Sequence, residues 1–182
     1  NKAIKAKCAR KSDYPFDEYK INKFDTTTQK RAIAKTDVLK FTTEVQPIGK
    51  QQYMELSKDI FVFSYLCGGI NFTDIANLTK ENIQNGRLHY IRQKTKKLIK
   101  IGIPQEAMQI IEKYSKESKG YLFPILDSHI HRTALQKQNR IHKILGKVNK
   151  NLKLLAADLG VEANLTTYVA RHSIFLFLLK NK

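Results

Sequence analysis

Arg171 is the residue whose type and position are best suited to chemistry on an anion. Thr166 and Thr167 precede it and an apolar run at 174–179 follows, which predicts a capped helix that is buried beyond its first turn. A reaction at a phosphodiester needs fixed positive charge against the developing oxyanion, and an arginine at a helix start supplies it beside the first backbone amides. An exposed arginine paired with a carboxylate is the ordinary alternative. The expected burial of the helix favours the anion.

Lys94 is the second candidate. It lies in the polar run Gln-Lys-Thr-Lys-Lys at 93–97, between β-rich runs at 88–92 and 98–103, so the sequence predicts a hairpin with lysines at its tip. An ammonium group at such a tip can reach into a DNA groove and protonate a leaving oxygen beside a phosphate. On these residues alone, a solvated turn lysine is the better-supported interpretation.

The charge of the chain indicates a polyanionic partner. Lys and Arg number 33 against 16 Asp and Glu, which gives a net charge of +17 over 182 residues and favours phosphate contacts with counterion release. Charge alone fits DNA, RNA, an anionic membrane surface or an acidic protein equally well. The length suits one domain, and the hydrophobic fraction of 42% is ample for a core.

The two cysteines and the length of the apolar runs indicate the cellular compartment in which the protein is expected. Cys8 and Cys67 lie in unlike surroundings without metal-ligand spacing, so we expect free thiols of a reducing compartment. The longest apolar run, 174–179, is too short to span a bilayer, and no signal peptide is visible at the N-terminus. The expected protein is cytoplasmic and has no membrane partner.

Motifs for a metal or a cofactor are not evident in the sequence. It contains no HExxH, P-loop or GxGxxG motif and no carboxylate cluster suited to Mg²⁺. His129 and His131 form a loose pair without further ligands close by, which favours surface histidines over a metal site. We therefore expect neither a cofactor nor a metal.

Helices must position most of these residues. Four segments show the three- and four-residue steps of a helix: 51–67, 70–78, 104–119 and about 133–159. The pair Asn85-Gly86 is a tight-turn signal in front of the β-rich runs. The predicted fold class is mainly α (α+β), with a small antiparallel sheet.

Several stretches resemble the catalytic domain of tyrosine recombinases, the phage-integrase family, in the form found in Bacteroidetes integrases of the conjugative-transposon type. Residues 166–173 resemble the second arginine box, which usually reads His-x-x-Arg-His, with Tyr168 at the place of the first His. The Arg-x-Lys-Thr pattern at 92–95 matches the hairpin that holds the family's catalytic lysine. Residues 30–33 and 69–78 are similar to other parts of the family.

The resemblance implies a tyrosine-recombinase catalytic-domain fold, mainly helical with a three-stranded antiparallel sheet. Residues 1–31 would be the end of a core-binding domain and the interdomain linker, and 32–182 a catalytic domain truncated before its nucleophile. All eight tyrosines fall at or before Tyr168, whereas the family places the nucleophile well after the arginine box. The family's first arginine is also missing, because Gly68 and Gly69 stand at its place.

Roles for individual residues follow from the same resemblance. Arg171 would neutralise the phosphorane, Lys94 would protonate the leaving 5′ oxygen, and Tyr168 would support a non-bridging oxygen. His172 would carry a proton or form a structural hydrogen bond, and Asp74 would orient the site or serve as a helix-terminus carboxylate. DNA contacts are expected from five basic residues: Arg92, Lys96, Lys97, Lys30 and Arg31.

The implied function is DNA integration or recombination by the integrase of a mobile genetic element. The complete protein would cut and rejoin double-stranded DNA through a 3′-phosphotyrosine, as a homotetramer on DNA, without a cofactor, while this chain alone would be inactive. A non-catalytic DNA-binding protein that keeps the fold is the alternative, supported by Gly68-Gly69 and the absent nucleophile. An RNA-binding helical protein rests on charge alone.

Overall fold

The computed structural model of the chain describes residues 2–13, 32–43, 53–116 and 119–180. The chain divides into two compact units, residues 1–30 and 31–182. The described part of the first unit contains α1 (Lys2–Lys5) and the 3-10 turn η1 (Lys11–Asp13). In the second unit the elements follow in this order: α2 (Lys35–Thr43), α3 (Met54–Leu66), α4 (Phe72–Ala76), η3 (Lys80–Asn82), β1 (Ile83–Gln84), β2 (Arg87–Ile91), β3 (Leu98–Gly102), α5 (Gln105–Ser115), α6 (Ala134–Asp158) and α7 (Thr167–Lys180).

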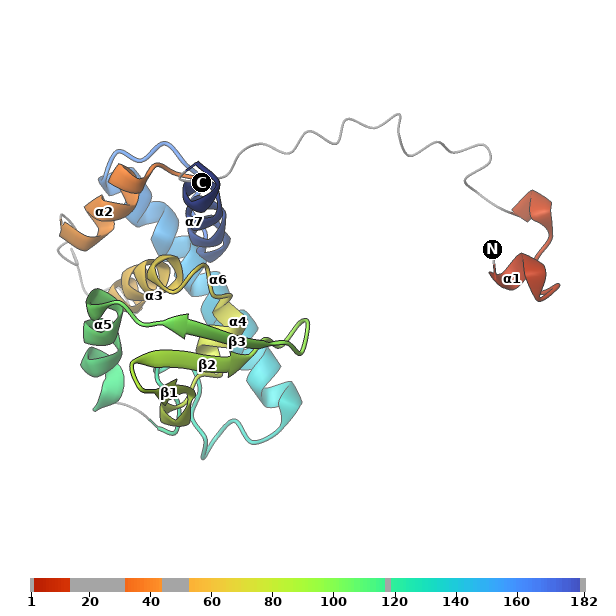
Figure 1. Cartoon of the computed structure of the whole chain (residues 1–182), viewed down its shortest axis with the longest axis horizontal. Helices are drawn as coiled ribbons and strands as arrows, with labels where there is room; N and C mark the ends of the chain where they lie inside the picture. Colours follow the sequence, from red (N-terminus) through yellow and green to blue (C-terminus); the bar gives the residue numbers. More distant parts are fainter. Residues whose placement is uncertain (1, 14–31, 44–52, 117–118, 181–182) are drawn as a thin grey trace. The chain divides into compact units, whose positions relative to one another are not determined.

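Helix α3 is the centre of the second unit. It packs against α2, α4, α5, α6 and α7, and Figure 1 shows these helices around it. Ile60, Phe61 and Phe63 of α3 are 0% exposed, so the helix is buried on more than one side. A helix that is apolar on several faces is stable only where neighbours cover each face. The predicted helix after Gln51 is therefore the core element that the others surround.

The two glycines after α3 end it in a Schellman motif. The backbone N–H of Gly69 donates to the carbonyl of Ser64 at 2.7 Å, and that of Cys67 donates to Phe63 at 2.9 Å. Gly68 and Gly69 have φ of +67° and +76°, a backbone region that side chains disfavour and glycine adopts freely. The predicted end of the helix at this pair is confirmed.

The sheet is three-stranded and antiparallel, in the order β1-β2-β3, as predicted. Asn85 and Gly86, with φ of 50° and 70°, form the tight turn between β1 and β2. In β2 the side chains alternate between the two faces of the sheet. Leu88 and Tyr90 are buried, whereas Ile91 is 59% exposed beside its cross-strand partner Leu98.

Helices α5 and α6 flank α3. The predicted long helix is α6: Thr133 caps its first turn by accepting from the Gln136 N–H at 3.2 Å, and Ile144, Val148 and Leu152 are 0% exposed. The prediction for α5 was wrong at its end, because the helix stops at Ser115 rather than continuing to the glycine at 120. That glycine is no helix cap. It lies against the side chain of Ser128.

Helix α7 departs from the prediction that it is buried beyond its first turn. Val169, Ala170 and Ser173 are buried, and α7 packs chiefly on α3. Phe175, Leu178 and Leu179 are instead exposed, by 60%, 54% and 52%. An apolar run covers every side of a helix, but neighbouring elements bury only the side that they contact. Across the described residues, no helix is both long and apolar enough to cross a membrane.

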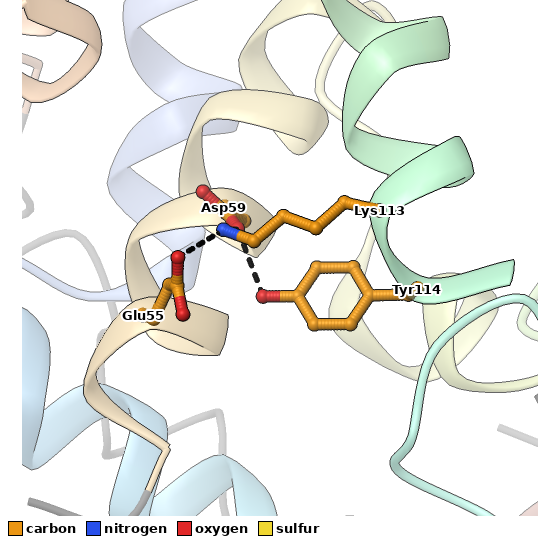
Figure 2. A network of polar contacts seen from close by, with 4 residues as sticks. All are labelled: Glu55, Asp59, Lys113 and Tyr114. Carbon is orange, nitrogen blue, oxygen red and sulfur yellow. Dashed lines mark hydrogen bonds and ion pairs between the residues drawn. The ribbon is translucent and has the colours of Figure 1, made fainter. Parts of the chain in front are cut away.

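A polar clasp joins α3 to α5 (Figure 2). The buried carboxylate of Asp59 accepts from the Lys113 ammonium at 2.6 Å and from the Tyr114 hydroxyl at 2.8 Å, while Glu55 accepts from the same ammonium. Burial by itself lowers the pKa of Lys113, but the hydrogen bonds to Asp59 and Glu55 raise it above its ordinary value. The ammonium is therefore held in its charged form across the α3–α5 contact.

Asp59→Ala is expected to lower the free energy of unfolding by about 2–3 kcal/mol, because it removes two charge-assisted hydrogen bonds from a buried carboxylate. Glu55→Ala is the matched control on the same ammonium. The side chain of Glu55 is 50% exposed, so its loss should cost only about 0–1 kcal/mol. Urea unfolding of both variants measures the difference, and equal losses would contradict the assignment of the clasp to Asp59.

Candidate functional site

Helix α7 carries three of the predicted site residues on one side. Arg171 and His172 follow Tyr168 by three and four positions, which makes each of them a neighbour of Tyr168 on the helix surface. The rings of Tyr168 and His172 meet edge to face, with centroids 4.5 Å apart. Arg171 is the fifth residue of α7, one turn later than expected, but helical side chains lean toward the N-terminus. Its guanidinium therefore belongs to the first-turn region.

Close packing against Gly69 fixes the backbone of Arg171. A Cβ atom at position 69 would lie 2.9 Å from the Arg171 Cα and 2.9 Å from its Cγ. Only a residue without a side chain permits this approach between the α3–α4 junction and α7. Gly68 differs, because the nearest atom to a Cβ there is the Ile101 Cδ1 at 4.0 Å.

The loop between β2 and β3 carries the basic residues of the hairpin. The Arg92 N–H donates to the Lys97 carbonyl at 2.9 Å and the Lys96 N–H donates to the Arg92 carbonyl at 2.8 Å, which closes the loop. Lys94, Lys96 and Lys97 are exposed on it, whereas Arg92 at its base is partly buried. The loop projects from the end of the sheet beside α4 (Figure 1). The predicted lysine-bearing hairpin tip is confirmed.

Asp74 ties this hairpin to α4. Its Oδ1 accepts from the Gln93 backbone N–H at 2.9 Å, and the residue is only 5% exposed. Asn71 caps α4 by accepting from the Thr73 N–H at 3.1 Å, so the helix that presents Asp74 starts at a defined place. Only two residues separate Gly69 from the start of α4. This short helix therefore links the base of the hairpin to the place where Gly69 contacts Arg171.

Asp74→Ala should release the hairpin base. The Gln93 N–H would lose its acceptor, and we expect faster amide hydrogen exchange over 92–97 while the exchange of the α3 core is unchanged. Asp74→Asn keeps an acceptor oxygen and serves as the matched control, with exchange close to that of the unchanged protein. Equal protection of the loop in the alanine variant would contradict the role of this hydrogen bond.

Tyr90 is a buried phenol whose pKa responds to three charged groups of the predicted site. Burial raises its pKa to about 12; the negative charge of Asp74 adds to the rise, and the positive charges of Arg171 and Arg92 oppose it. The phenol therefore stays neutral at physiological pH. The charges of Asp74 on α4, Arg171 on α7 and Arg92 at the hairpin base thus all act on this one phenol.

Arg171, Arg92 and Lys94 form no ion pair with a carboxylate anywhere in residues 2–13, 32–43, 53–116 and 119–180. Over these ranges the salt bridges are made by Lys40, Lys113 and Lys119. The ordinary alternative for Arg171, pairing with a carboxylate, is thus not realised within the part of the chain that is described. Arg171 and Arg92 are also partly buried, and partly buried cations without a carboxylate partner favour an external anion.

A pocket of about 490 Å³ opens between α4, the hairpin and the N-terminal half of α6. Its lining combines amide, hydroxyl and basic groups with apolar ones: Thr73, Asn77, Gln93, Ala134, Lys137, Gln138, Ile141, His142 and Leu145. The pocket places the start of α6 beside the base of the hairpin.

The described residues offer no group of three or more His, Cys, Asp or Glu side chains arranged to hold a metal ion. The ring Nδ1 of His131 accepts from the Asp127 backbone N–H at 2.9 Å, so this histidine stabilises its own loop. Cys8 is exposed and Cys67 buried, both as free thiols, and burial raises the pKa of Cys67 to about 12.

The structure describes seven of the predicted site residues, and their roles stay predictions: Tyr168, Arg171, His172, Arg92, Lys94, Lys96 and Lys97. Lys30 and Arg31, predicted to contact DNA, lie outside the described residues. Tyr90 and the packing of Gly69 on Arg171 were missed. Strand alternation from Arg92 could have placed Tyr90 on the same face of the sheet, but the contact of Gly69 has no local signal.

No family model and no curated protein matches the chain. Among solved structures, it is similar to XerA recombinase with a TM-score of 0.54 and 12% identity, over 85% of this chain and 52% of that chain. It is also similar to the integrase of transposon Tn1549 in complex with circular intermediate DNA, with a TM-score of 0.58 and 19% identity, over 99% of this chain and 62% of that chain. A variant of that integrase gives a TM-score of 0.61 and 18% identity.

The chain spans between 52% and 62% of the length of these proteins. Its fold is the tyrosine-recombinase catalytic-domain fold, mainly helical with a three-stranded antiparallel sheet. The fold predicted from the resemblance is confirmed.

Proposed function

We propose that this chain, from residue 32 on, is the catalytic domain of a tyrosine recombinase that cuts and rejoins double-stranded DNA during integration. Residues 1–31 would join it to a core-binding domain. The reaction would pass through a 3′-phosphotyrosine whose tyrosine is not among the eight of this chain, so this chain alone would be inactive. The complete protein would act as a cytoplasmic homotetramer on DNA and without a cofactor.

The observation that carries this proposal is the state of Arg171. It is partly buried, fixed against Gly69, and free of any carboxylate partner in the described ranges. An arginine whose backbone is held in one place, and which has no carboxylate partner among the described residues, keeps its guanidinium available for an anion. Within this fold, the scissile phosphate is the anion that fits.

Each further residue has a proposed role. Lys94 on the exposed hairpin loop would enter a DNA groove and protonate the leaving 5′ oxygen. Tyr168 would donate to a non-bridging oxygen, and its ring contact orients it against His172, which would serve as a hydrogen-bonding partner or proton carrier. Arg92, Lys96 and Lys97, together with Lys30 and Arg31, would contact the DNA backbone.

A second candidate function is DNA binding without chemistry. The Schellman motif after α3 supports it, because positive φ favours glycine at Gly68 and Gly69, the pair that stands where the family has its first arginine. Loss of one fixed charge from a phosphoryl-transfer site costs on the order of 3–4 kcal/mol of transition-state stabilisation. A relic that binds DNA and does not cut it would have this feature.

Both candidates require binding to duplex DNA, and its salt dependence tests that requirement. The logarithm of the affinity of this chain for a random-sequence duplex should fall steeply and linearly with the logarithm of salt concentration. Lys97→Ala on the hairpin is expected to reduce the magnitude of the slope by about 1. The control is Lys153→Ala, because Lys153 is exposed on the half of α6 away from the hairpin. Equal slopes for all three proteins would reject the hairpin as a DNA contact.

A further inference from the structure

Arg92 and Arg171 reach one place from two different elements. Hydrogen bonding between Arg92 and Lys97 continues the β2–β3 ladder by one pair beyond Ile91, so Arg92 keeps the strand alternation. Its side chain therefore leaves the sheet on the face of Tyr90, two residues earlier, which is the face turned toward the core. Arg171 comes from α7, where Gly69 fixes its backbone, and Gly68, one residue earlier, faces the side chain of Ile101. Ile101 pairs with Leu88 on the same face of the sheet as Tyr90, so the Gly68-Gly69 pair links Arg171 to that face.

The electrostatics of Tyr90 agree with this geometry. Burial dominates the raised pKa of the phenol, and Arg171 and Arg92 both act on it as positive charges in opposition to Asp74. Asp74 is the acidic group of this set, and its Oδ1 is already engaged by the Gln93 N–H. Two guanidinium groups against one carboxylate leave a local excess of one positive charge. An anion with several oxygens would balance that excess charge and accept hydrogen bonds from both guanidinium groups.

We infer that Arg92 and Arg171 bind the same phosphate group, Arg92 from the base of the hairpin and Arg171 from α7. The inference rests on the proposed function and deepens it, because Arg92 becomes a ligand of the reacting phosphate rather than one of several backbone contacts. The backbone bonds of Arg92 to Lys97 and Lys96 close the loop around it and hold the residue in place. The site is thereby assembled from two elements about eighty residues apart in the sequence.

The experiment uses this chain and inorganic phosphate as the probe. The side-chain Nε–H resonance of Arg171, observed by NMR, is titrated with phosphate to give a dissociation constant at that residue. Arg92→Ala is expected to weaken phosphate at Arg171 about tenfold, the loss of one charge-assisted contact. Arg92→Lys keeps the charge but lacks the planar fork, so it should lie between Arg92→Ala and the unchanged protein. Lys100→Ala removes one exposed charge from β3, where Lys100 pairs with His89 on the face of the sheet opposite Tyr90, and is the matched control.

The outcomes separate this inference from the proposed function. A tenfold loss in Arg92→Ala with less than a twofold change in Lys100→Ala, and with backbone resonances of the core unmoved, supports a shared phosphate. If Arg92→Ala changes the constant no more than Lys100→Ala does, the shared site is wrong while Arg171 remains an anion ligand. If the Nε–H resonance of Arg171 in the unchanged protein does not shift with phosphate at all, the proposal of an anion site at Arg171 is wrong as well.

Discussion

Arg171→Ala in the complete gene product is expected to slow DNA strand cleavage about 100- to 1,000-fold, the usual loss when one fixed donor to a developing oxyanion is removed. The reason is local: Arg171 is held against Gly69 and forms no carboxylate ion pair in the described ranges, so its charge is available to the phosphate. Single-turnover cleavage of nicked duplex DNA measures the rate. Affinity for DNA should fall far less, because many phosphates contribute to binding.

Arg171→Lys separates charge from geometry. Lysine keeps the positive charge but not the planar fork, so we expect a cleavage rate between those of the alanine variant and the unchanged protein. Both variants should unfold at nearly the same urea concentration as the unchanged protein, because no ion pair of Arg171 with a described carboxylate is lost. An alanine variant that cleaves at the normal rate would remove Arg171 from the reacting centre.

Gly69→Ala is expected to destabilise the protein by about 2–5 kcal/mol. The new Cβ would lie 2.9 Å from two atoms of Arg171, one of them in the backbone, so α7 or the α3–α4 junction must move. Overpacking of this kind costs about 1–3 kcal/mol, and the positive φ adds about 1–2 kcal/mol for a residue with a side chain. Urea unfolding gives the loss of stability, and phosphate binding at Arg171 should weaken in the same variant.

Gly68→Ala is the matched control, because its φ of +67° is as unfavourable as that of Gly69 while the space around it is open. It should cost only the backbone strain, about 1–2 kcal/mol, and leave phosphate binding at Arg171 unchanged. Equal destabilisation by the two substitutions would mean that Gly69 is required for its backbone angle alone. The contact between Gly69 and Arg171 would then contribute nothing to the free energy of unfolding.

Local signals in the sequence predict the sheet and the long helix well. Asn85-Gly86 determines the turn between β1 and β2, and the regular apolar steps from Ile141 to Leu155 determine the face that α6 buries. The hairpin loop with Lys94 follows from the polar run between two strands. In each of these elements, residues close in sequence decide the structure.

The parts that could not be predicted depend on residues far apart in the chain. The exposure of Phe175 and Leu178 depends on which elements pack on α7, and an apolar run gives no information about that. The close approach of Gly69 to Arg171 joins positions more than a hundred residues apart. The positions of Arg92 and Arg171 near Tyr90 likewise depend on contacts between distant segments, such as that of Gly68 with Ile101. The DNA contacts of Lys30 and Arg31 stay predictions.

Trapping of a covalent protein–DNA complex tests the central claim most directly. The complete gene product would be incubated with nicked duplexes that span the ends of the proposed mobile element, and the adducts would be separated under denaturing conditions. The account predicts an adduct joined through a tyrosine to the 3′ phosphate of the cut strand, and its loss in Arg171→Ala. Salt-sensitive DNA binding without any adduct would contradict it and identify a DNA-binding protein that has kept the recombinase fold.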